Sequence, residues 1–493
     1  MRIHPDAAIW TLVVALLLCC ACAADSDADD DDDDAAGDDD AVDDDDFGDD
    51  DDAPNPYQGM QPDGLMIVEI LGIASHMSTG PQYSWPREFE IEQSVAAGVH
   101  TSRRGFYWNH IEPQDDQWQF AGYDVMIDLL VQAGLTPMAM LTRGVSWAMP
   151  NGSPSDIDPA VFADFTGTVA QRYADQIDLY EIWNEPNMGR FWSPQADPEH
   201  FGLLLKAAYA GVHEQDPTAQ VLFGGLSPLD DNLFDPRGIW NFVARVGEAH
   251  PDLCQHIDGL AIHPYTFLQQ PGPEYSLDLG FYRYPNLRDS IGQARGLLEQ
   301  LGCGEIPIHL TEMGWPSLLI GQERQAAYFQ RGVLLAASIN VQSFCWYTFF
   351  DETPDSTIPT EDYFGLYHLP DEDELTDPPP KEAYHTLVGL NQVLGQSRYA
   401  GDLGAVLGWD EANFALVFVD DADAWTVALW HFSEKFNEQA QAAVPLHPAA
   451  VGQWTLFDEH GAELESGDAT DAELELTISG EVRFLRFWVQ PES

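Results

Sequence analysis

From residue 64 onward, short apolar runs alternate with stretches whose apolar residues recur at helical spacing. This alternation is typical of repeated strand–helix units that build a parallel sheet. Helices are expected at 160–175 and 199–215, which follow Asp158-Pro159 and Asp197-Pro198, and at 321–339. Strands are expected at 65–71, 101–107, 136–141, 177–183, 220–225, 257–262, 307–311 and 341–349. Eight such units over roughly 330 residues predict an α/β fold, a (β/α)8 TIM barrel spanning residues 64–395.

The pattern changes after the amphipathic stretch 381–394, which we expect to close the barrel. Strand-like runs separated by Asp, Gly and Pro turns follow at 414–419, 424–432, 452–457, 472–478 and 482–489. Residues 396–493 are therefore predicted to form a small all-β sandwich domain that packs against the barrel. Stabilising the barrel and binding carbohydrate both remain open as roles of this domain.

Residues 1–22 have the pattern of an export signal. Arg2 precedes the apolar stretch 7–18, which is short for a membrane span and runs into Cys19-Cys20-Ala21-Cys22-Ala23. This end resembles a bacterial lipobox, in which Cys22 or Cys20 becomes the lipidated first residue. Ordinary cleavage after Ala23 is the alternative. We expect an exported protein, either a lipoprotein of the bacterial cell envelope or a secreted one.

Residues 23–63 are dominated by aspartate and predict a disordered linker, because they bury too little apolar surface to offset chain entropy. The chain has a formal net charge of -63, and without the 19 aspartates between Asp25 and Asp52 the remainder still carries -44. Such a surface repels nucleic acid and anionic membranes, because a phosphate-binding face needs clustered Lys and Arg. We therefore expect no nucleic-acid partner.

Two glutamates that follow apolar runs supply the candidate chemistry. Glu185 stands two residues after the fourth run, and Glu312 follows the seventh directly. The carboxyl ends of all barrel strands meet at one face, where the active sites of this fold are built. A glycosidase needs two carboxyls there, because one protonates the departing glycosidic oxygen while the other attacks or stabilises the anomeric carbon. The pair therefore predicts a glycosidase.

The segments Trp183-Asn184-Glu185-Pro186 and Thr311-Glu312-Met313-Gly314-Trp315 resemble the two signatures of the clan A glycoside hydrolases. Within that clan the chain resembles the cellulase-like family 5 and the xylosidase-like family 39, over nearly the whole predicted barrel. The resemblance implies that Glu185 is the general acid/base and Glu312 the nucleophile. It also implies retention of anomeric configuration, for which the two carboxyls stand about 5–5.5 Å apart.

The nucleophile must stay ionised, so it needs a cation beside it. Arg103 is the candidate, because the segment from Arg103 to Trp108 resembles the clan's second-strand pattern. Strand alternation then turns Arg104 to the opposite face, unless the register is shifted by one residue. Glu181 falls on the inward face, deeper than Glu185, where a buried carboxylate needs a partner such as an arginine.

Three further residues are expected to line the site. Asn184 can donate its amide to the sugar 2-hydroxyl, a contact that strengthens in the transition state. His263 and Tyr265 end the sixth run and resemble the histidine and tyrosine that line the clan's site. The alternative for His263 is that it caps its strand by bonding backbone carbonyls.

Tryptophans are the candidates for sugar stacking, because the C–H faces of a sugar ring pack against indole. Trp346, in the eighth run, resembles the tryptophan that floors the clan's central subsite. Trp315 and Trp108 are further substrate-binding candidates, and Trp147 and Trp192 lie near the same face. For each of them, burial in the core is the alternative.

Beyond the leader the chain contains Cys254, Cys303 and Cys345. Cys254 and Cys303 precede neighbouring predicted strands, so in an exported protein they either form a disulfide or remain two free thiols. Cys345 is expected to be a buried packing residue. Neither a metal nor an organic cofactor is predicted, because the cysteines lack zinc spacing and no Gly-rich nucleotide loop is present.

Together these features predict an exported, monomeric, retaining glycoside hydrolase that cleaves β-linked oligo- or polysaccharides through a covalent glycosyl-enzyme. A non-catalytic carbohydrate-binding protein, a structural surface protein and a transglycosylase on the same scaffold are the alternatives. The sugar and the linkage remain open, because resemblance to a family reports fold and mechanism better than specificity.

Overall fold

The computed structural model describes residues 55–76, 84–228, 238–266, 269, 271–278, 283–352, 361–369, 377–469 and 473–490. The predicted export signal with Cys20 and Cys22, and the linker up to residue 54, lie outside the described residues. Within the described ranges, no helix combines the length and the apolar character needed to cross a membrane.

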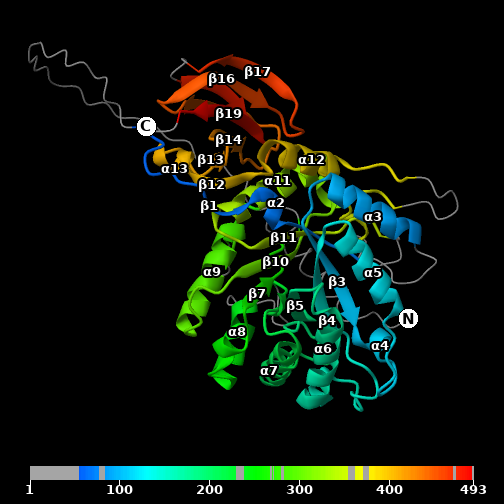
Figure 1. Ribbon diagram of the computed structural model, residues 1–493. Coiled ribbons are helices and arrows are strands. Elements are labelled where there is room, and N and C mark those ends of the chain that lie inside the picture. The colour runs from blue at the N-terminus through cyan, green and yellow to red at the C-terminus, as the bar shows by residue number, and fades with distance from the viewer. Residues whose placement is uncertain are drawn as a thin grey trace, which may run out of the picture. The chain divides into compact units, whose positions relative to one another are not determined.

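Eight parallel strands form a closed barrel, as the sequence predicted (Figure 1). Around the barrel they follow the order β10-β11-β2-β3-β4-β5-β6-β7. They are β2 (Leu71–Ala74), β3 (Thr101–Tyr107), β4 (Thr136–Thr142), β5 (Leu179–Asn184), β6 (Gln220–Leu226), β7 (Gly259–Ile262), β10 (Ile308–Met313) and β11 (Ser343–Tyr347). Because all eight run in the same direction, their carboxyl ends meet at one face of the barrel.

Helices follow the strands and cover the outside of the barrel (Figure 1). Two predicted helix starts are confirmed, since the side chains of Asp158 and Asp197 accept from backbone N–H groups of the first turn and a proline follows each of them. The helices are α3 (Ser84–Ala96), α4 (Trp108–Ile111), α5 (Ala121–Gln132), α6 (Pro159–Tyr173), α7 (Pro198–Gln215), α8 (Gly238–Ala249), α9 (Leu287–Gln300), α10 (Ser317–Ile320), α11 (Gln322–Ser338) and α12 (Glu382–Leu394).

The prediction of a first barrel strand at 65–71 was wrong. Its residues divide among β1 (Asp63–Met66), the helical turn α2 (Ile67–Ile70) and the start of β2. The Glu69 side chain accepts from Met66 N at 2.7 Å and so caps the turn, while Ile67 and Ile70 are buried. A continuous apolar run does not distinguish a strand from a buried helical turn, which is why the sequence pattern failed here.

The predicted end of the linker at residue 63 also differs from the structure. Tyr57 is only 2% exposed, and its hydroxyl donates to Pro445 O at 2.6 Å. Strand β1 pairs with β12 (Ser397–Asp402), not with a barrel strand. The segment from Asn55 to Met66 therefore belongs structurally with the C-terminal domain, through contacts so distant in sequence that local patterning could not predict them.

The C-terminal domain is all-β, as predicted. A seven-stranded sheet has the order β1-β12-β13-β14-β19-β16-β17, and β15 pairs with β18 as a separate two-stranded ribbon. The ribbon and one face of the sheet share a core that includes Val417, Leu429, Val444, Leu476 and Leu485. The remaining bounds are α13 (Leu403–Val406), β13 (Asn413–Asp420), β14 (Ala424–His431), β15 (Ala440–Pro445), β16 (Ala450–Phe457), β17 (Glu463–Asp468), β18 (Glu473–Ile478) and β19 (Arg483–Val489).

Both members of a buried ion pair in the barrel also hydrogen-bond the C-terminal domain. Arg331 on α11 is 1% exposed, and it donates through Nη2 to Glu274 Oε2 at 2.9 Å and through Nη1 to Gly480 O at 2.9 Å. Trp430 of β14 donates to the other oxygen of Glu274, also at 2.9 Å. Because Glu274 lies in the segment between β7 and α9, one carboxylate ties this segment to a barrel helix and to the second domain.

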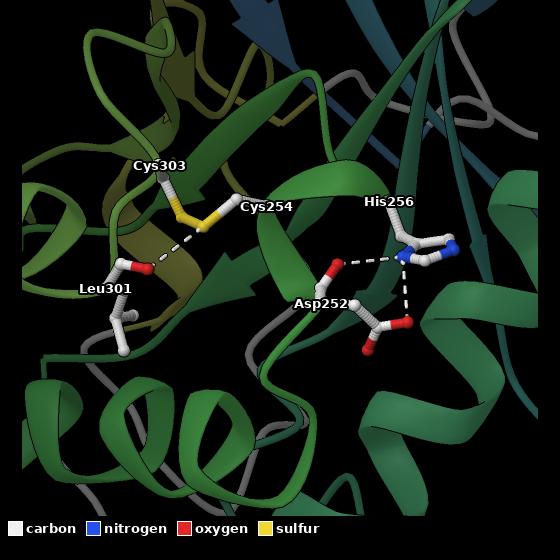
Figure 2. Close-up of a disulfide and its surroundings, with 5 residues drawn as sticks. All are labelled: Asp252, Cys254, His256, Leu301 and Cys303. Carbon is white, nitrogen blue, oxygen red and sulfur yellow. Dashed lines mark hydrogen bonds and ion pairs between the residues drawn. A yellow bond between two sulfur atoms is a disulfide. The ribbon is translucent and has the colours of Figure 1, made fainter.

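Cys254 and Cys303 form a disulfide, with their Cα atoms 4.8 Å apart (Figure 2). Cys254 lies in the turn Leu253–Gln255 before β7, and Cys303 follows α9 before β10. Since β7 and β10 are paired, the bridge joins the entry ends of two neighbouring barrel strands. Cys345 is free and buried, as expected, and burial raises the pKa of its thiol to about 12.

Reduction of the Cys254–Cys303 disulfide is expected to lower the free energy of unfolding by about 2–4 kcal/mol, because the bridge restricts the unfolded chain. Calorimetry with and without reductant measures the effect. The C254S/C303S variant is the matched control, since it has no bridge to reduce. Equal melting temperatures for the oxidised and reduced wild-type protein would contradict the prediction.

Candidate active site

Glu185 lies at the carboxyl end of β5, where the backbone leaves the strand sharply. Trp183 and Glu185 have φ angles of 70° and 43°, in the left-handed region that few non-glycine residues adopt. The turn at Trp183 interrupts strand alternation, so its ring packs in the outer core, 5.1 Å from the ring of Trp192. Asn184 and Glu185 consequently both find side-chain partners inside the barrel. Backbone strain of this kind is concentrated at functional sites.

Arg103 is held inside the barrel by two carboxylates. Its Nε and Nη2 donate to the two oxygens of Glu181 at 2.6 and 2.7 Å. Its Nη1 donates to Glu312 Oε1 at 2.6 Å, and Nη2 also donates to Asn184 Oδ1 at 3.1 Å. Arg103 is 4% exposed and Glu181 is fully buried. The structure thus brings together the arginine, the buried carboxylate and the candidate nucleophile that the sequence analysis named.

Arg104 points to the opposite side, as strand alternation predicted. Its Nη2 donates to Glu90 Oε1 at 2.6 Å, and both side chains are 2% exposed. The register of β3 is therefore the expected one, with Arg103 inward and Arg104 toward α3.

His263 lies between the two candidate catalytic carboxylates. Its Nδ1 is 3.1 Å from Glu185 Oε1 and 3.5 Å from Glu312 Oε2, and its Nε2 is 3.1 Å from Thr311 Oγ1. A hydrogen on Nδ1 can therefore be donated to either carboxylate. Because these partners are side chains, the alternative that His263 caps a strand through backbone carbonyls does not apply.

Gly225 of β6 makes room for this cluster. A Cβ at this position would lie 2.2 Å from His263 Nε2 and 2.5 Å from Glu181 Oε1. Its backbone N donates to Glu181 Oε1 at 3.0 Å, and its carbonyl accepts from Glu185 N at 2.8 Å. Gly225 is a site residue that sequence reasoning missed, because glycine occurs near many strand ends and gives no distinctive signal there.

Tyr265 also contacts the candidate nucleophile. Its hydroxyl donates to Glu312 Oε2 at 3.2 Å, and burial together with the nearby Glu312 charge raises the phenol pKa well above its ordinary value. The hydroxyl therefore keeps its proton and acts as a donor. Tyr284 donates in turn to Tyr265 O at 2.5 Å and fixes this part of the chain.

Glu312 is kept ionised by its neighbours. Burial alone would raise its pKa, but the charges of His263 and Arg103, with the Arg103 hydrogen bond, outweigh burial and lower the pKa to about 2. The expectation that a cation accompanies Glu312 agrees with this geometry. Glu185 has a different partner, Arg190, whose Nη2 donates to Glu185 Oε2 at 2.9 Å.

Glu185, His263 and Glu312 each offer one ligand atom within 4.8 Å of the others, a spacing that could also suit a metal ion. The local charges argue against a metal here. Arg103 and Arg190 already neutralise Glu312 and Glu185 at 2.6 and 2.9 Å, and both guanidinium groups would repel a divalent cation. The arrangement fits proton transfer and nucleophilic attack better than metal binding.

The assignment of Trp346 and Trp315 to sugar binding was wrong. Both are fully buried. The Trp346 ring packs edge-on against Phe329 of α11 at 4.9 Å, and its Nε1 donates to Phe364 O at 3.0 Å. Trp315 donates to Thr266 Oγ1 at 2.9 Å and lies beside Trp346. Neither ring has a free face against which a sugar could stack.

Trp108 was also assigned wrongly. It is fully buried, stacks on Phe165 of α6 at 4.9 Å and donates to Glu112 Oε2 at 2.8 Å. Trp108 is the first residue of α4, beyond the end of β3, and its ring lies with the helices outside the barrel. Trp147 and Trp192 likewise pack with the outer core.

Strand alternation identifies the inward residue of β11 that the sequence analysis missed. Cys345 packs with the inner core residues, so Tyr347 rather than Trp346 faces the site. The Tyr347 ring lies 5.5 Å from His76, and its hydroxyl donates to Glu352 Oε1 at 3.4 Å. His76 Nδ1 is 2.7 Å from the same oxygen. No local pattern links His76 to Glu352, so the sequence gives no signal for this contact.

Comparison with known proteins supports the fold. No family model matches the chain. A β-xylosidase of Geobacillus stearothermophilus is 24% identical over 280 residues, which cover 55% of this chain and 51% of that protein. The chain thus matches about half the length of this curated relative.

Two solved structures extend the comparison to nearly the whole chain. A family 39 glycoside hydrolase from the gut symbiont Bacteroides cellulosilyticus WH2 has a TM-score of 0.65 and 22% identity, covering 87% of this chain and 83% of that one. A monomeric β-xylosidase from Caulobacter crescentus CB15 has a TM-score of 0.59 and 15% identity, covering 88% and 98%. These likenesses show the fold, and they agree with the family 39 resemblance seen in the sequence motifs.

Replacing Arg103 with methionine is expected to lower the free energy of unfolding by about 3–5 kcal/mol, because Glu181 would remain buried without its cation. In the E181Q variant the same replacement is expected to lower the free energy of unfolding by less, since glutamine leaves no buried charge at position 181. Denaturant titrations of the wild type, both single variants and the double variant measure this coupling. If the double variant lost as much stability as the two single variants together, the predicted coupling between Arg103 and Glu181 would be refuted.

Proposed function

We propose that this chain is a retaining glycoside hydrolase that cleaves β-linked saccharides by double displacement. The observation that carries the proposal is the pair Glu185 and Glu312 at the ends of β5 and β10, with carboxylate oxygens within 4.8 Å of each other. Retaining enzymes hold their carboxyls about 5–5.5 Å apart, whereas inverting enzymes leave about 6.5–9.5 Å for a water molecule. The spacing therefore supports direct attack by one carboxylate.

In the first step, Glu312 attacks the anomeric carbon and forms an ester bond while the glycosidic C–O bond breaks. Glu185 gives its proton to the departing oxygen. In the second step, Glu185 takes a proton from water, whose oxygen attacks the anomeric carbon and releases Glu312. The depressed pKa of Glu312 supports its role as the nucleophile, since an ionised carboxylate is needed at the start.

Arg190 can stabilise Glu185 in the second step of the reaction, which starts with Glu185 ionised. Its Nη2 donates to Glu185 Oε2, while His263 contacts Oε1. The Arg190 side chain is 49% exposed and lies over Phe191, with its guanidinium carbon 4.6 Å from the ring centroid. A half-exposed arginine can move away when a leaving group approaches, so Glu185 can carry a proton in the first step and be ionised in the second.

Asn184 is oriented for a contact with the sugar. Arg103 Nη2 donates to its Oδ1, so the amide oxygen is already engaged and the NH2 group remains as a donor. An N–H donor beside the nucleophile suits the sugar 2-hydroxyl, whose hydrogen bonds strengthen as the ring approaches the oxocarbenium-like transition state. Arg103 thus positions the amide as well as the carboxylate.

A β-xyloside is the first substrate to test, because the Geobacillus and Caulobacter proteins to which the chain is similar are described as β-xylosidases. We further propose that the protein is exported, as a cell-envelope lipoprotein or a secreted protein, and acts as a monomer on carbohydrate. A transglycosylase would use the same glycosyl-enzyme with a sugar acceptor in place of water. A non-catalytic binding protein remains the alternative from another class.

Variants of the two glutamates test the reaction. E185Q is expected to slow cleavage of an unactivated β-linked disaccharide by about 10²–10⁴-fold, because the leaving oxygen is no longer protonated. Formation of the glycosyl-enzyme from a 2,4-dinitrophenyl glycoside is expected to change much less, since that leaving group departs without a proton. E312Q is expected to slow both substrates, because it lacks the nucleophile.

Stopped-flow burst kinetics separates the two steps for each variant. E299Q, at an exposed position on α9, is the control for loss of a surface carboxylate and should behave as the wild type. Wild-type rates in both E185Q and E312Q, on every glycoside that the protein hydrolyses, would overturn the assignment and favour catalysis elsewhere in the chain.

A further inference from the structure

Arg143 is an exposed cation without a carboxylate partner in the described part of a strongly acidic chain. The chain has 83 Asp and Glu against 20 Lys and Arg. Some surface cations are paired, such as Arg172 with Asp124, Lys206 with Asp252 and Arg398 with Asp421, at 2.6–2.9 Å. Others in the described residues, such as Arg245 and Lys435, are exposed without a carboxylate partner, as Arg143 is. Arg143 differs from these cations in its place directly after the barrel strand β4 and in its backbone conformation.

The backbone of Arg143 is fixed in an unusual conformation directly after β4. Its φ angle is 65°, in the left-handed region that favours glycine, and its carbonyl accepts from Asn109 N at 3.3 Å. A glycine stands one position later, where a Cβ would lie 2.4 Å from Met149 Sδ. The chain therefore carries a long cationic side chain at a position where glycine would be less strained, which points to a use for that side chain.

The guanidinium lies at the carboxyl end of the barrel, over an inward-facing ring. Its Cζ is 5.5 Å from the ring centroid of Tyr107. Tyr107 stands four residues after Arg103 on β3 and therefore faces the same side of the strand. The Tyr107 ring folds back over Gly105, where a Cβ would lie 2.6 Å from its Cζ. Arg143 is therefore exposed above the Tyr107 ring, and within the described residues its guanidinium has no hydrogen-bond partner.

The same tyrosine connects Arg143 with the candidate nucleophile. Burial raises the pKa of the Tyr107 phenol, the charges of Arg143 and Arg103 lower it, and the charge of Glu312 raises it. The geometry agrees, because Tyr107 stands four residues after Arg103 and so on the same face of β3, and Arg103 donates to Glu312 Oε1 at 2.6 Å. A group bound by Arg143 would belong to the saccharide whose anomeric carbon meets Glu312, or to the sugar next to it.

We propose that Arg143 binds an anionic group of the substrate, the carboxylate of a uronic acid, and that the natural substrate is an acidic β-linked saccharide. This inference rests on the proposed function and names its substrate class. A planar guanidinium matches a carboxylate with two parallel hydrogen bonds. It would also offset the repulsion between an anionic saccharide and the acidic surface of the protein. A sulfate ester presents the same charge and acceptor oxygens, so the experiment distinguishes these two sources.

The test compares 4-nitrophenyl β-glycosides that differ only at C5: the xyloside, the glucoside, the glucuronide and the 6-sulfated glucoside. A neutral xylo-oligosaccharide and the same oligosaccharide with a uronate branch test whether the anion is carried by a neighbouring sugar. The wild type is expected to show the highest kcat/KM on a uronate-bearing member. R143Q is expected to lose about 10–100-fold on that member and to leave the neutral ones unchanged.

R143K keeps the charge but not the two-pronged donor geometry, so it should fall between the wild type and R143Q. R245Q removes another exposed arginine, on α8, and should match the wild type on every substrate. A preference for the sulfated member would identify sulfate as the anion. No preference for any anionic member, or a preference that R143Q leaves intact, would overturn the inference.

Failure of the proposed function gives a different result from failure of this inference. If neutral glycosides are hydrolysed through Glu185 and Glu312 but acidic ones are not favoured, only the inference is wrong. If no glycoside is hydrolysed, the proposed function is wrong. Calorimetric binding of a glucuronate-bearing oligosaccharide to the wild type and R143Q then tests Arg143 separately, and equal affinities would overturn its role.

Discussion

The buried guanidinium of Arg103 is the interaction on which the site depends. Glu181, Glu185 and Glu312 converge at one end of the barrel, and removing a carboxylate from water costs several kcal/mol. Arg103 offsets this cost by donating to Glu181 twice and to Glu312 once, with distances of 2.6–2.7 Å. The guanidinium is planar and rigid, so its hydrogen bonds fix the positions of the carboxylates on β5 and β10 relative to β3. Without this cation, the close carboxylates that the proposed chemistry needs would repel each other.

The C-terminal domain supports the site indirectly. The segment between β7 and α9 carries Tyr265, which contacts Glu312, and Tyr284, which bonds the Tyr265 carbonyl. Glu274 in the same segment accepts from Arg331 of the barrel and from Trp430 of the second domain. The segment therefore contacts both the candidate nucleophile and the C-terminal domain. These contacts fit the structural role that the sequence left open beside carbohydrate binding.

The sequence predicted the elements that depend on local pattern. The glutamates at the ends of β5 and β10 were identified correctly because a strand end is visible as the end of an apolar run. Alternation correctly turned Arg103 inward and Arg104 outward. Alternation did not decide the tryptophans, because Trp108 begins α4 beyond the end of β3, and which of Trp346 and Tyr347 faces inward depends on the phase of β11, which only the folded barrel shows.

Other features lay beyond local pattern. The left-handed turn at Trp183, which lets Asn184 and Glu185 both face inward, has no signal in the residues around it. The pairing of β1 with β12 joins segments far apart in the chain, and so does the contact of His76 with Glu352. Such contacts form because packing and charge favour them in the folded state, and a single sequence does not reveal them.

The stereochemistry of the first product tests the account most directly. Hydrolysis of a β-linked substrate, followed by proton NMR from the first minutes, distinguishes the anomers before mutarotation equilibrates them. The short separation of Glu185 and Glu312, with Glu312 ionised beside Arg103, predicts that the β-anomer appears first. An α-anomer formed first would contradict direct attack by Glu312 and would require a water molecule between the two carboxylates.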